Sequence, residues 1–317
     1  MIRLDSRREA AALLTTACVL LLIAAIAPSF YSWSNLRDIA LANLPLLLIA
    51  GGMTLVIVVG QIDLSVGSAF AVCAVCIGDL AHAGVPAPLL PIVAILIGAA
   101  LGAVNGALVS LLRAPSIVVT LATMVAWRQM LYLVTGGAWV AHLPARFQWF
   151  GLGQTGGETL LFLCAVAVFA ALVWCSGHLA AFRWLYATGS DSGAARLSGI
   201  PTNAVVFFAF VLLGALTGLS SALNAARFTE IPANAGIGLE LQAIAAVVIG
   251  GAPITGGHGR LTGTLCGVVL LSAIGPALTY IGLSASWERA IQGAIILAAV
   301  LIDVAAGRAE RRRALAR

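Results

Sequence analysis

Continuous apolar runs of about 20 residues are the feature that most limits how this chain can fold, because a helix of that length crosses a bilayer core. Examples are residues 11–30, 91–112 and 116–134. Charged residues make up only 9% of the chain, whereas a soluble domain carries about 25%. The runs are continuous rather than alternating, which indicates membrane-spanning helices rather than barrel strands. The chain is therefore expected to be embedded in a lipid bilayer.

We predict an all-α polytopic membrane protein that forms one transmembrane domain over residues 1–317, with about ten transmembrane helices. The sixth apolar run is slightly short, and Gly275 and Pro276 are expected to interrupt the ninth. The predicted spans cover residues 11–30, 39–60, 69–80, 91–112, 116–134, 159–175, 202–226, 239–249, 261–283 and 286–304.

Arginine placement predicts the orientation of these spans. All 17 basic residues are arginine, with three in the first eight residues and five after Gly307. If both termini are cytoplasmic, twelve arginines lie inside, four lie outside, and Arg128 falls within a span. The net charge of +5 is thus a sign of membrane topology, with no nucleic acid expected as a partner. Arg128 is expected to extend its guanidinium toward the outer surface.

Several kinds of chemistry are not expected. The chain has no lysine and no phosphate-binding loop of the G-x-x-x-x-G-K-[ST] type, so it is not expected to hold ATP in that way. The pair Cys73 and Cys76 lies in an apolar run, which favours two buried small side chains over a metal or redox site. We predict no catalytic residues, no metal and no cofactor.

A polar island interrupts the apolar runs at residues 189–201, which read G-S-D-S-G-A-A-R-L-S-G-I-P. Its glycine, serine, aspartate and proline residues indicate turns. Residues 193–198 have room for about one and a half helical turns, too few to be stable alone in water. An ordinary solvated loop and a docking point for a partner protein are both compatible with this composition.

Two further segments look alike and suggest a parallel internal repeat. Residues 56–68 and residues 246–259 each begin with a β-branched run, reach glycine, break at polar residues and return to an apolar run. Paired glycine-broken helices are the best sequence indication of a transport path. Recurrence by chance in a chain with 34 glycines is the alternative.

The motifs, taken in order, resemble the ribose-type permeases of ATP-binding-cassette importers. G-Q-I-D-L-S-V-G-S at residues 60–68 is close to the family's G-G-I-D-L-S-V-G-S, with Gln61 in place of the usual second glycine. L-G-A-V-N-G-A-L-V at residues 101–109, A-A-R-L-S-G-I at residues 194–200 and G-L-E-L-Q-A-I at residues 238–244 follow in the family's order. The resemblance covers roughly residues 35–305 and implies a permease subunit of the bacterial inner membrane, multi-pass, with no ATPase site of its own.

The resemblance also implies partners and a coupling loop. Residues 186–201 would be the cytoplasmic loop that docks on a separate ATPase subunit, with the contact made by Ala194, Ala195, Arg196 and Gly199. A periplasmic sugar-binding protein and a second permease subunit, identical or different, would complete the complex in the lipid bilayer. The broken-helix motif would comprise Gly60, Asp63, Ser65, Gly67 and Ser68.

Burying a polar residue within a membrane span costs free energy, so each such residue is a candidate for a functional role. Asp63 is expected to cap the following helix, with Ser65 and Ser68 in support. Five further residues are candidates for the translocation path: Asn105, Thr120, Asn224, Glu240 and Gln242. Bonds between helices would equally explain Asn105 and Asn224. Capping of the eighth span would equally explain Glu240 and Gln242.

The substrate is expected to be a monosaccharide moved by alternating access. The segments T-G-G-A-W-V and Y-A-T-G-S-D resemble the branch that carries rhamnose or a furanose-type quorum signal, and rhamnose is favoured, with a pentose as a further alternative. A secondary transporter driven by an ion gradient is the rival class. It would place acidic residues deep in several spans, and only Asp79 and Glu240 come near, beside Asp63. A channel is a third option, and the chain carries no selectivity-filter motif in its favour.

Overall fold

The computed structural model describes residues 3–282 and, beyond them, residues 287, 290, 291, 293, 294 and 297. Over these residues the predicted all-helical class is confirmed, with one isolated bridge between Val140 and Ile231. The tenth predicted span and the arginine-rich tail fall mostly outside the described residues. The helices are α1 (Arg3–Ile26), η1 (Pro28–Tyr31), α2 (Trp33–Ala42), α3 (Leu44–Val58), α4 (Val66–His82), η2 (Ala87–Leu89), α5 (Leu90–Ser110), α6 (Ser116–Thr135), η3 (Gln148–Gly151), α7 (Gly153–His178), α8 (Ala180–Ser190), α9 (Ser192–Leu197), α10 (Thr202–Ala225), α11 (Leu239–Ile249) and α12 (Leu261–Tyr280).

Within the part of the chain that the structure describes, fewer helices are long enough to cross a membrane than the spans predicted there. Among the described residues, five helices pass on length and composition, and α2 with α3 makes a sixth if that pair, bent by 46°, is one span. The apolar part of α1 (Ala12–Ile26), α4 and α11 are shorter. The apolar runs were therefore located correctly, but polar and glycine-rich breaks cut several of them below the length of a full crossing.

The structure also differs from the predicted spans at α7 and at α12. α7 has 26 residues, so its span is longer than expected, because the polar residues at its start are also helical. α12 continues through Pro276, so the predicted interruption of that span is wrong. In both cases side chains that look like helix breakers in sequence are accommodated within a continuous helix.

The core is built around α3, which is buried along almost its whole length. A helix that is apolar on every side needs neighbours on every side. α3 packs against α7, α10, α11 and α12. One polar link joins it to α12, where the hydroxyls of Thr54 and Thr264, both buried, lie 2.7 Å apart.

The closest helix pair is α5 with α10, and glycines make the approach possible. Gly98, Gly102 and Gly106 recur at every fourth residue of α5, and Gly214 and Gly218 do so on α10. A Cβ added at Gly98 would overlap the carbonyl oxygen of Gly214, and one at Gly102 would overlap that of Phe210. Small residues spaced in this way let helix backbones meet directly in membranes.

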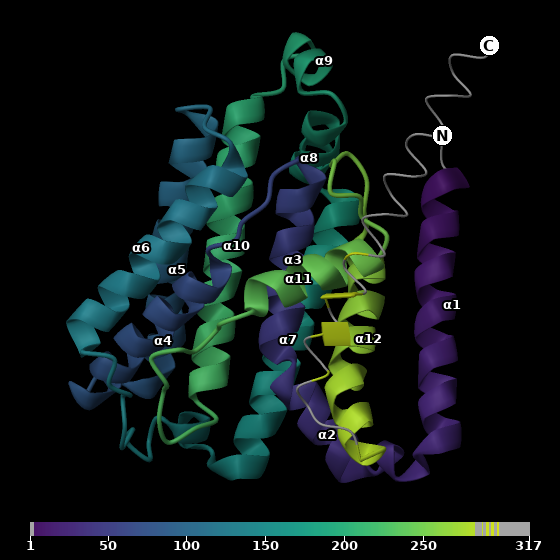
Figure 1. The fold of residues 1–317 in the computed structure, drawn as a ribbon. Coiled ribbons are helices and arrows are strands. Elements are labelled where there is room, and N and C mark those ends of the chain that lie inside the picture. The colour runs from purple at the N-terminus through teal and green to yellow at the C-terminus, as the bar shows by residue number, and fades with distance from the viewer. Residues whose placement is uncertain (1–2, 283–286, 288–289, 292, 295–296, 298–317) are drawn as a thin grey trace.

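Different helices lie at the two ends of the bundle (Figure 1). α8 and α9 lie at one end, with the start of α1 on the same side, and α2 lies at the other end. We call these the α9 end and the α2 end. Figure 1 also shows α11 crossing the bundle obliquely, whereas α3 and α10 run along it.

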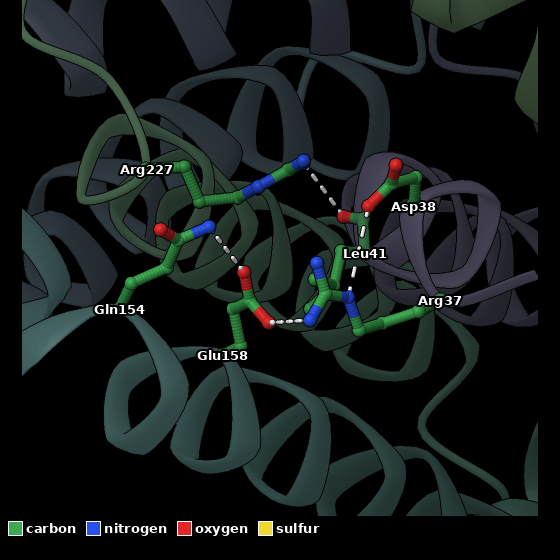
Figure 2. Close-up of polar contacts among 6 residues, drawn as sticks. All are labelled: Arg37, Asp38, Leu41, Gln154, Glu158 and Arg227. Carbon is green, nitrogen blue, oxygen red and sulfur yellow. Dashed lines mark hydrogen bonds and ion pairs between the residues drawn. The ribbon is translucent and has the colours of Figure 1, made fainter. Parts of the chain in front are cut away.

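At the α2 end, a buried carboxylate joins α7 to α2, and a separate hydrogen bond joins the end of α10 to α2 (Figure 2). Glu158 of α7, 7% exposed, faces Arg37 of α2 at 3.3 Å and accepts a hydrogen bond from Gln154 at 2.9 Å. Arg227, just after α10, donates to the carbonyl of Leu41 in α2 at 2.8 Å. A buried charge is stable only when it is paired and hydrogen-bonded, which this arrangement achieves for Glu158.

Candidate functional site

The polar island folds into a six-residue helix, α9 (Ser192–Leu197), which is capped at both ends. The carboxylate of Asp191 accepts hydrogen bonds from the backbone N–H groups of Gly193 and Ala194, both at 2.9 Å. Gly199, with φ of 83°, ends the helix, and the Ile200 N–H returns to the Ala195 carbonyl at 3.1 Å. Such caps satisfy the free backbone groups of a helix too short to persist alone.

The exposure of α9 separates the four residues proposed for partner contact. Ala194 and Arg196 are exposed, Gly199 lies in the turn, and Ala195 is buried against the body of the protein. The sequence reasoning missed Leu197, which is 92% exposed. A lone leucine in an otherwise polar island was the available signal.

The predicted loop at residues 186–201 is partly wrong, because residues up to Ser190 belong to α8. This helix is held in place by Leu185 and Thr188, both buried, and by Tyr186, whose hydroxyl donates to the Gly259 carbonyl at 2.8 Å. The solvent-facing element is therefore confined to α9 and its two flanking turns.

A set of close backbone contacts, the glycine junction, connects α8 to the core. It consists of Val58 and Gly60 at the end of α3, Gly189 and Ser190 at the end of α8, and Gly256 and Gly257 before α12. A Cβ at Gly189 would overlap the Val58 carbonyl oxygen, and that oxygen accepts a hydrogen bond from the Gly257 N–H at 2.8 Å. The end of α8, which leads into α9, is therefore in direct backbone contact with α3 and with the loop before α12.

The two segments predicted to form a repeat meet at this junction. Gly60 of the first break lies against Gly256 of the second, close enough that a Cβ on Gly256 would come within 2.7 Å of the Gly60 Cα. Each segment has the order helix, break, helix. Because α11 crosses the bundle obliquely, the likeness holds for the breaks more than for the direction of the helices before them.

Asp63 organises the first break, as expected, but with different partners. Its Oδ1 accepts from the backbone N–H of Ser65 at 2.7 Å and from the Ser65 hydroxyl at 2.6 Å, so it fixes the turn before α4 rather than the N–H groups within that helix. Asn105 of α5 donates to the Ser65 hydroxyl at 2.8 Å. All three side chains are buried.

The first turns of α4 and α6 hold this break from the other side. Thr120 donates to the Ser116 carbonyl at 2.8 Å and approaches the Ile62 carbonyl at 3.4 Å, and Ser68 donates to the Met124 carbonyl at 2.8 Å. Asn105 and Thr120, proposed for the translocation path, thus both lie in the network around the break.

Arg128 does not extend to the surface as expected. Its guanidinium donates to the carbonyls of Ala233, Ala235 and Gly67 at 2.9 to 3.2 Å. The loop before α11 offers the first two acceptors, and the first turn of α4 offers the third. Gly67 also lies against the Glu240 carboxylate and Gly236, which leaves no room for a side chain at that position. Arg128 and Gly67 therefore fasten the start of α4 to the start of α11.

The remaining path candidates divide between this contact and a cavity at the α2 end. Glu240 accepts from the Gly238 N–H at 3.2 Å and so stays at the start of its own helix. Asn224 and Gln242 line a cavity of about 520 Å³, together with Trp139 and Glu230. Pockets of this size, with a few polar groups among apolar walls, suit small ligands.

Removing the cap of α9 tests whether its fold depends on Asp191. The Asp191→Ala variant should lose about 1 kcal/mol of local helix stability, since two backbone donors lose their acceptor. We expect amide hydrogen exchange at residues 193–197 to accelerate about fivefold, measured by mass spectrometry on the purified protein. Asp191→Asn, which keeps an acceptor oxygen, is the control, and equal exchange in all three proteins would contradict the capping role.

Comparison with known proteins defines the class of protein that this fold and site belong to. The model of a family described as a branched-chain amino acid transport system permease component matches residues 35–300. The chain belongs to this family of membrane permeases, which confirms the resemblance to permease subunits of ATP-binding-cassette importers.

Individual relatives narrow the comparison. The chain is 35% identical over 306 residues to the autoinducer 2 import system permease protein LsrC of Yersinia pseudotuberculosis, covering 95% of this chain and 86% of the relative. It is 33% identical over 305 residues to the LsrC protein of Salmonella typhi, with the same coverage. No solved structure matches the chain.

Proposed function

We propose that the chain carries a furanose-type signal sugar of the autoinducer 2 kind across the inner membrane, driven by a separate ATPase that docks on α9. The relatives named above are autoinducer 2 import permeases, and they give no support to the rhamnose preference. A permease 35% identical over nearly its whole length is best assigned a substrate close to theirs.

The observation that carries the coupling role is the exposed, capped helix α9 and its connection to the glycine junction. ATP binding in the partner would press on Leu197, and the junction would pass that displacement to α3. In this proposal the α9 end faces the cytoplasm and the α2 end faces the periplasm, where a sugar-binding protein delivers the substrate. A second permease subunit, identical or different, completes the complex.

Transport by the reconstituted complex tests the substrate and the energy source together. The permease with its second permease subunit, the ATPase and the sugar-binding protein would be placed in vesicles with ATP on the ATPase side. We expect labelled autoinducer 2 to accumulate, and unlabelled rhamnose in tenfold excess to leave that uptake unchanged.

Each alternative has its own result in this assay. Accumulation of labelled rhamnose in preference to the furanose would overturn the substrate. Accumulation by the permease alone, with an ion gradient and no ATP, would establish the secondary transporter instead.

A further inference from the structure

Two exposed arginines border a groove at the α9 end that has no role in the function described so far. The groove lies between the end of α5 and the start of α10, and its volume is about 640 Å³. Arg113 comes from the turn between α5 and α6, and Arg196 comes from α9. We call this surface the arginine groove. The packing of the helices thus brings two positive charges from distant parts of the sequence to one groove.

Neither arginine is neutralised by the part of the chain that the structure describes. Both side chains are exposed, and none of the described residues forms an ion pair or a hydrogen bond with either guanidinium. The carboxylate of Asp191, which precedes Arg196 in the sequence, accepts instead from the N–H groups of Gly193 and Ala194. None of the described residues that line the groove is acidic. The groove therefore suits an anionic partner.

The wall of the groove between the arginines is apolar. Its apolar side chains come from both helices and from the turn before α10: Leu111, Ile200, Pro201, Ala204 and Phe207. Leu111 is 68% exposed, and Leu112, which follows it, is 71% exposed. Exposed leucines are unfavourable in water and stable against acyl chains. This part of the groove is therefore expected to lie against lipid.

The groove is preformed, because its two sides are in direct contact below it. Gly106 of α5 lies so close to Phe207 of α10 that a Cβ added there would come within 2.9 Å of the Phe207 carbonyl oxygen. A rigid groove loses little conformational entropy when a ligand enters it. Binding therefore requires only that the two exposed arginine side chains become ordered.

An anionic phospholipid matches both features of the arginine groove. A guanidinium donates two parallel hydrogen bonds to phosphate oxygens, and basic pockets between membrane helices are a recurrent type of headgroup site. A soluble anion would satisfy the arginines but would leave the apolar wall without a partner. A phospholipid covers that wall with an acyl chain while its phosphate stays at the rim.

We propose that the arginine groove binds an anionic phospholipid, with its phosphate held by Arg113 and Arg196 and an acyl chain along Leu111 and Phe207. Binding requires only that the α9 end lies at a membrane surface, whichever side of the membrane that is. Leu197, the exposed leucine of α9, does not line the groove, so a lipid and a protein partner can be bound together. One consequence rests on the proposed function: a lipid held by Arg196 tethers the coupling helix, so the lipid composition sets how freely α9 moves.

The test measures lipid binding to the purified full-length permease in detergent. The protein is titrated with phosphatidylglycerol that carries a photoreactive group in its acyl chain, and the cross-linked residues are identified by mass spectrometry. We expect labelling at residues 110–113 and 200–207, and no labelling there by phosphatidylcholine with the same group. Arg113→Gln and Arg196→Gln should each lower the affinity for phosphatidylglycerol about fivefold, and the double variant about twentyfold or more.

Arg183→Gln is the matched control for Arg196→Gln. Arg183 is also exposed at the α9 end, in α8, but it does not line the groove. Its replacement removes the same charge, so a general loss of surface attraction would appear equally in both variants. We expect Arg183→Gln to bind phosphatidylglycerol like the wild type, and the thermal midpoints of all these proteins to agree.

The outcomes decide the site and the source of the phosphate separately from transport. Equal affinities in the wild type and the double variant, or an equal loss in Arg183→Gln and Arg196→Gln, would overturn the arginine groove as a lipid site. Displacement of the lipid by excess inorganic phosphate would replace the lipid with a soluble anion. These results leave the proposed function standing, because the assay contains no ATPase and no sugar. Conversely, a complex that moves no sugar would overturn the proposed function and leave the lipid affinities unchanged.

Discussion

Replacing Gly102 with leucine is expected to abolish the folded permease. A side chain at this position must displace the backbone of α10, because its Cβ alone would overlap the Phe210 carbonyl oxygen. Overpacking of a well-packed core typically costs about 1–3 kcal/mol, and a rigid backbone neighbour puts this change at the top of that range or above it. We expect the detergent-solubilised variant to give no monodisperse peak in size-exclusion chromatography.

Gly177→Leu is the matched control for this experiment. Gly177 also lies in a helix, near the end of α7, but a Cβ there would meet nothing within 4 Å. Since leucine is the better helix former, this variant should elute and melt like the wild type. A stable, monodisperse Gly102→Leu protein would show that α5 and α10 are not held in direct backbone contact.

Replacing Leu197 with aspartate is expected to uncouple the permease from its ATPase without unfolding it. The side chain is 92% exposed, so the change removes no packing within the chain. An apolar anchor at a protein contact is worth about 2 kcal/mol or more, which corresponds to a loss of affinity of roughly 30-fold. Binding of the ATPase subunit to the immobilised permease, together with ATP-driven uptake, would measure the effect.

Leu197→Met keeps an apolar side chain of similar volume and should retain most of the binding. The thermal midpoints of all three proteins should agree, which excludes damage to the fold. If the aspartate variant binds the ATPase and transports like the wild type, α9 is not the coupling element.

The sequence was sufficient for the class of fold and for the position of α9. The spans near residues 91–112 and 116–134 match α5 and α6 within two residues, and the run at residues 239–249 matches α11. These elements are defined by local patterns: an apolar run, a flanking proline or glycine, and a polar island between two runs. Such local patterns can be recognised from the amino-acid sequence alone.

The polar contacts of the site could not be predicted from local sequence patterns. In the sequence, Glu158 looks like the end of a loop. In the structure it lies within α7 and pairs with Arg37, which is far away in sequence. Arg128 finds carbonyls in a segment more than 100 residues later. Pairings between distant segments depend on how the helices pack, which no local pattern encodes.

Hydrogen-bond partners and exposure, which residue type alone does not reveal, add information on two further residues. Asn105 was an equal candidate for sugar contact and for a bond between helices, and its bond to the Ser65 hydroxyl ties it to the turn at Asp63. Leu197 was passed over because leucine is common throughout the chain, and its exposure is what distinguishes it.

The direct backbone contact between α5 and α10 bears on how the cavity of about 700 Å³ at the α9 end could change shape during transport. Helices joined through glycines have no side-chain layer in which to slide, so Ser110 at the end of α5 and Asn203 at the start of α10 should travel as one rigid body. Under the proposed function, we expect this cavity to widen at the opposite wall, where α8 meets α3 through the glycine junction. The turnover rate of the importer would accordingly be set by how readily that seam parts and closes, and not by bending of the helices themselves.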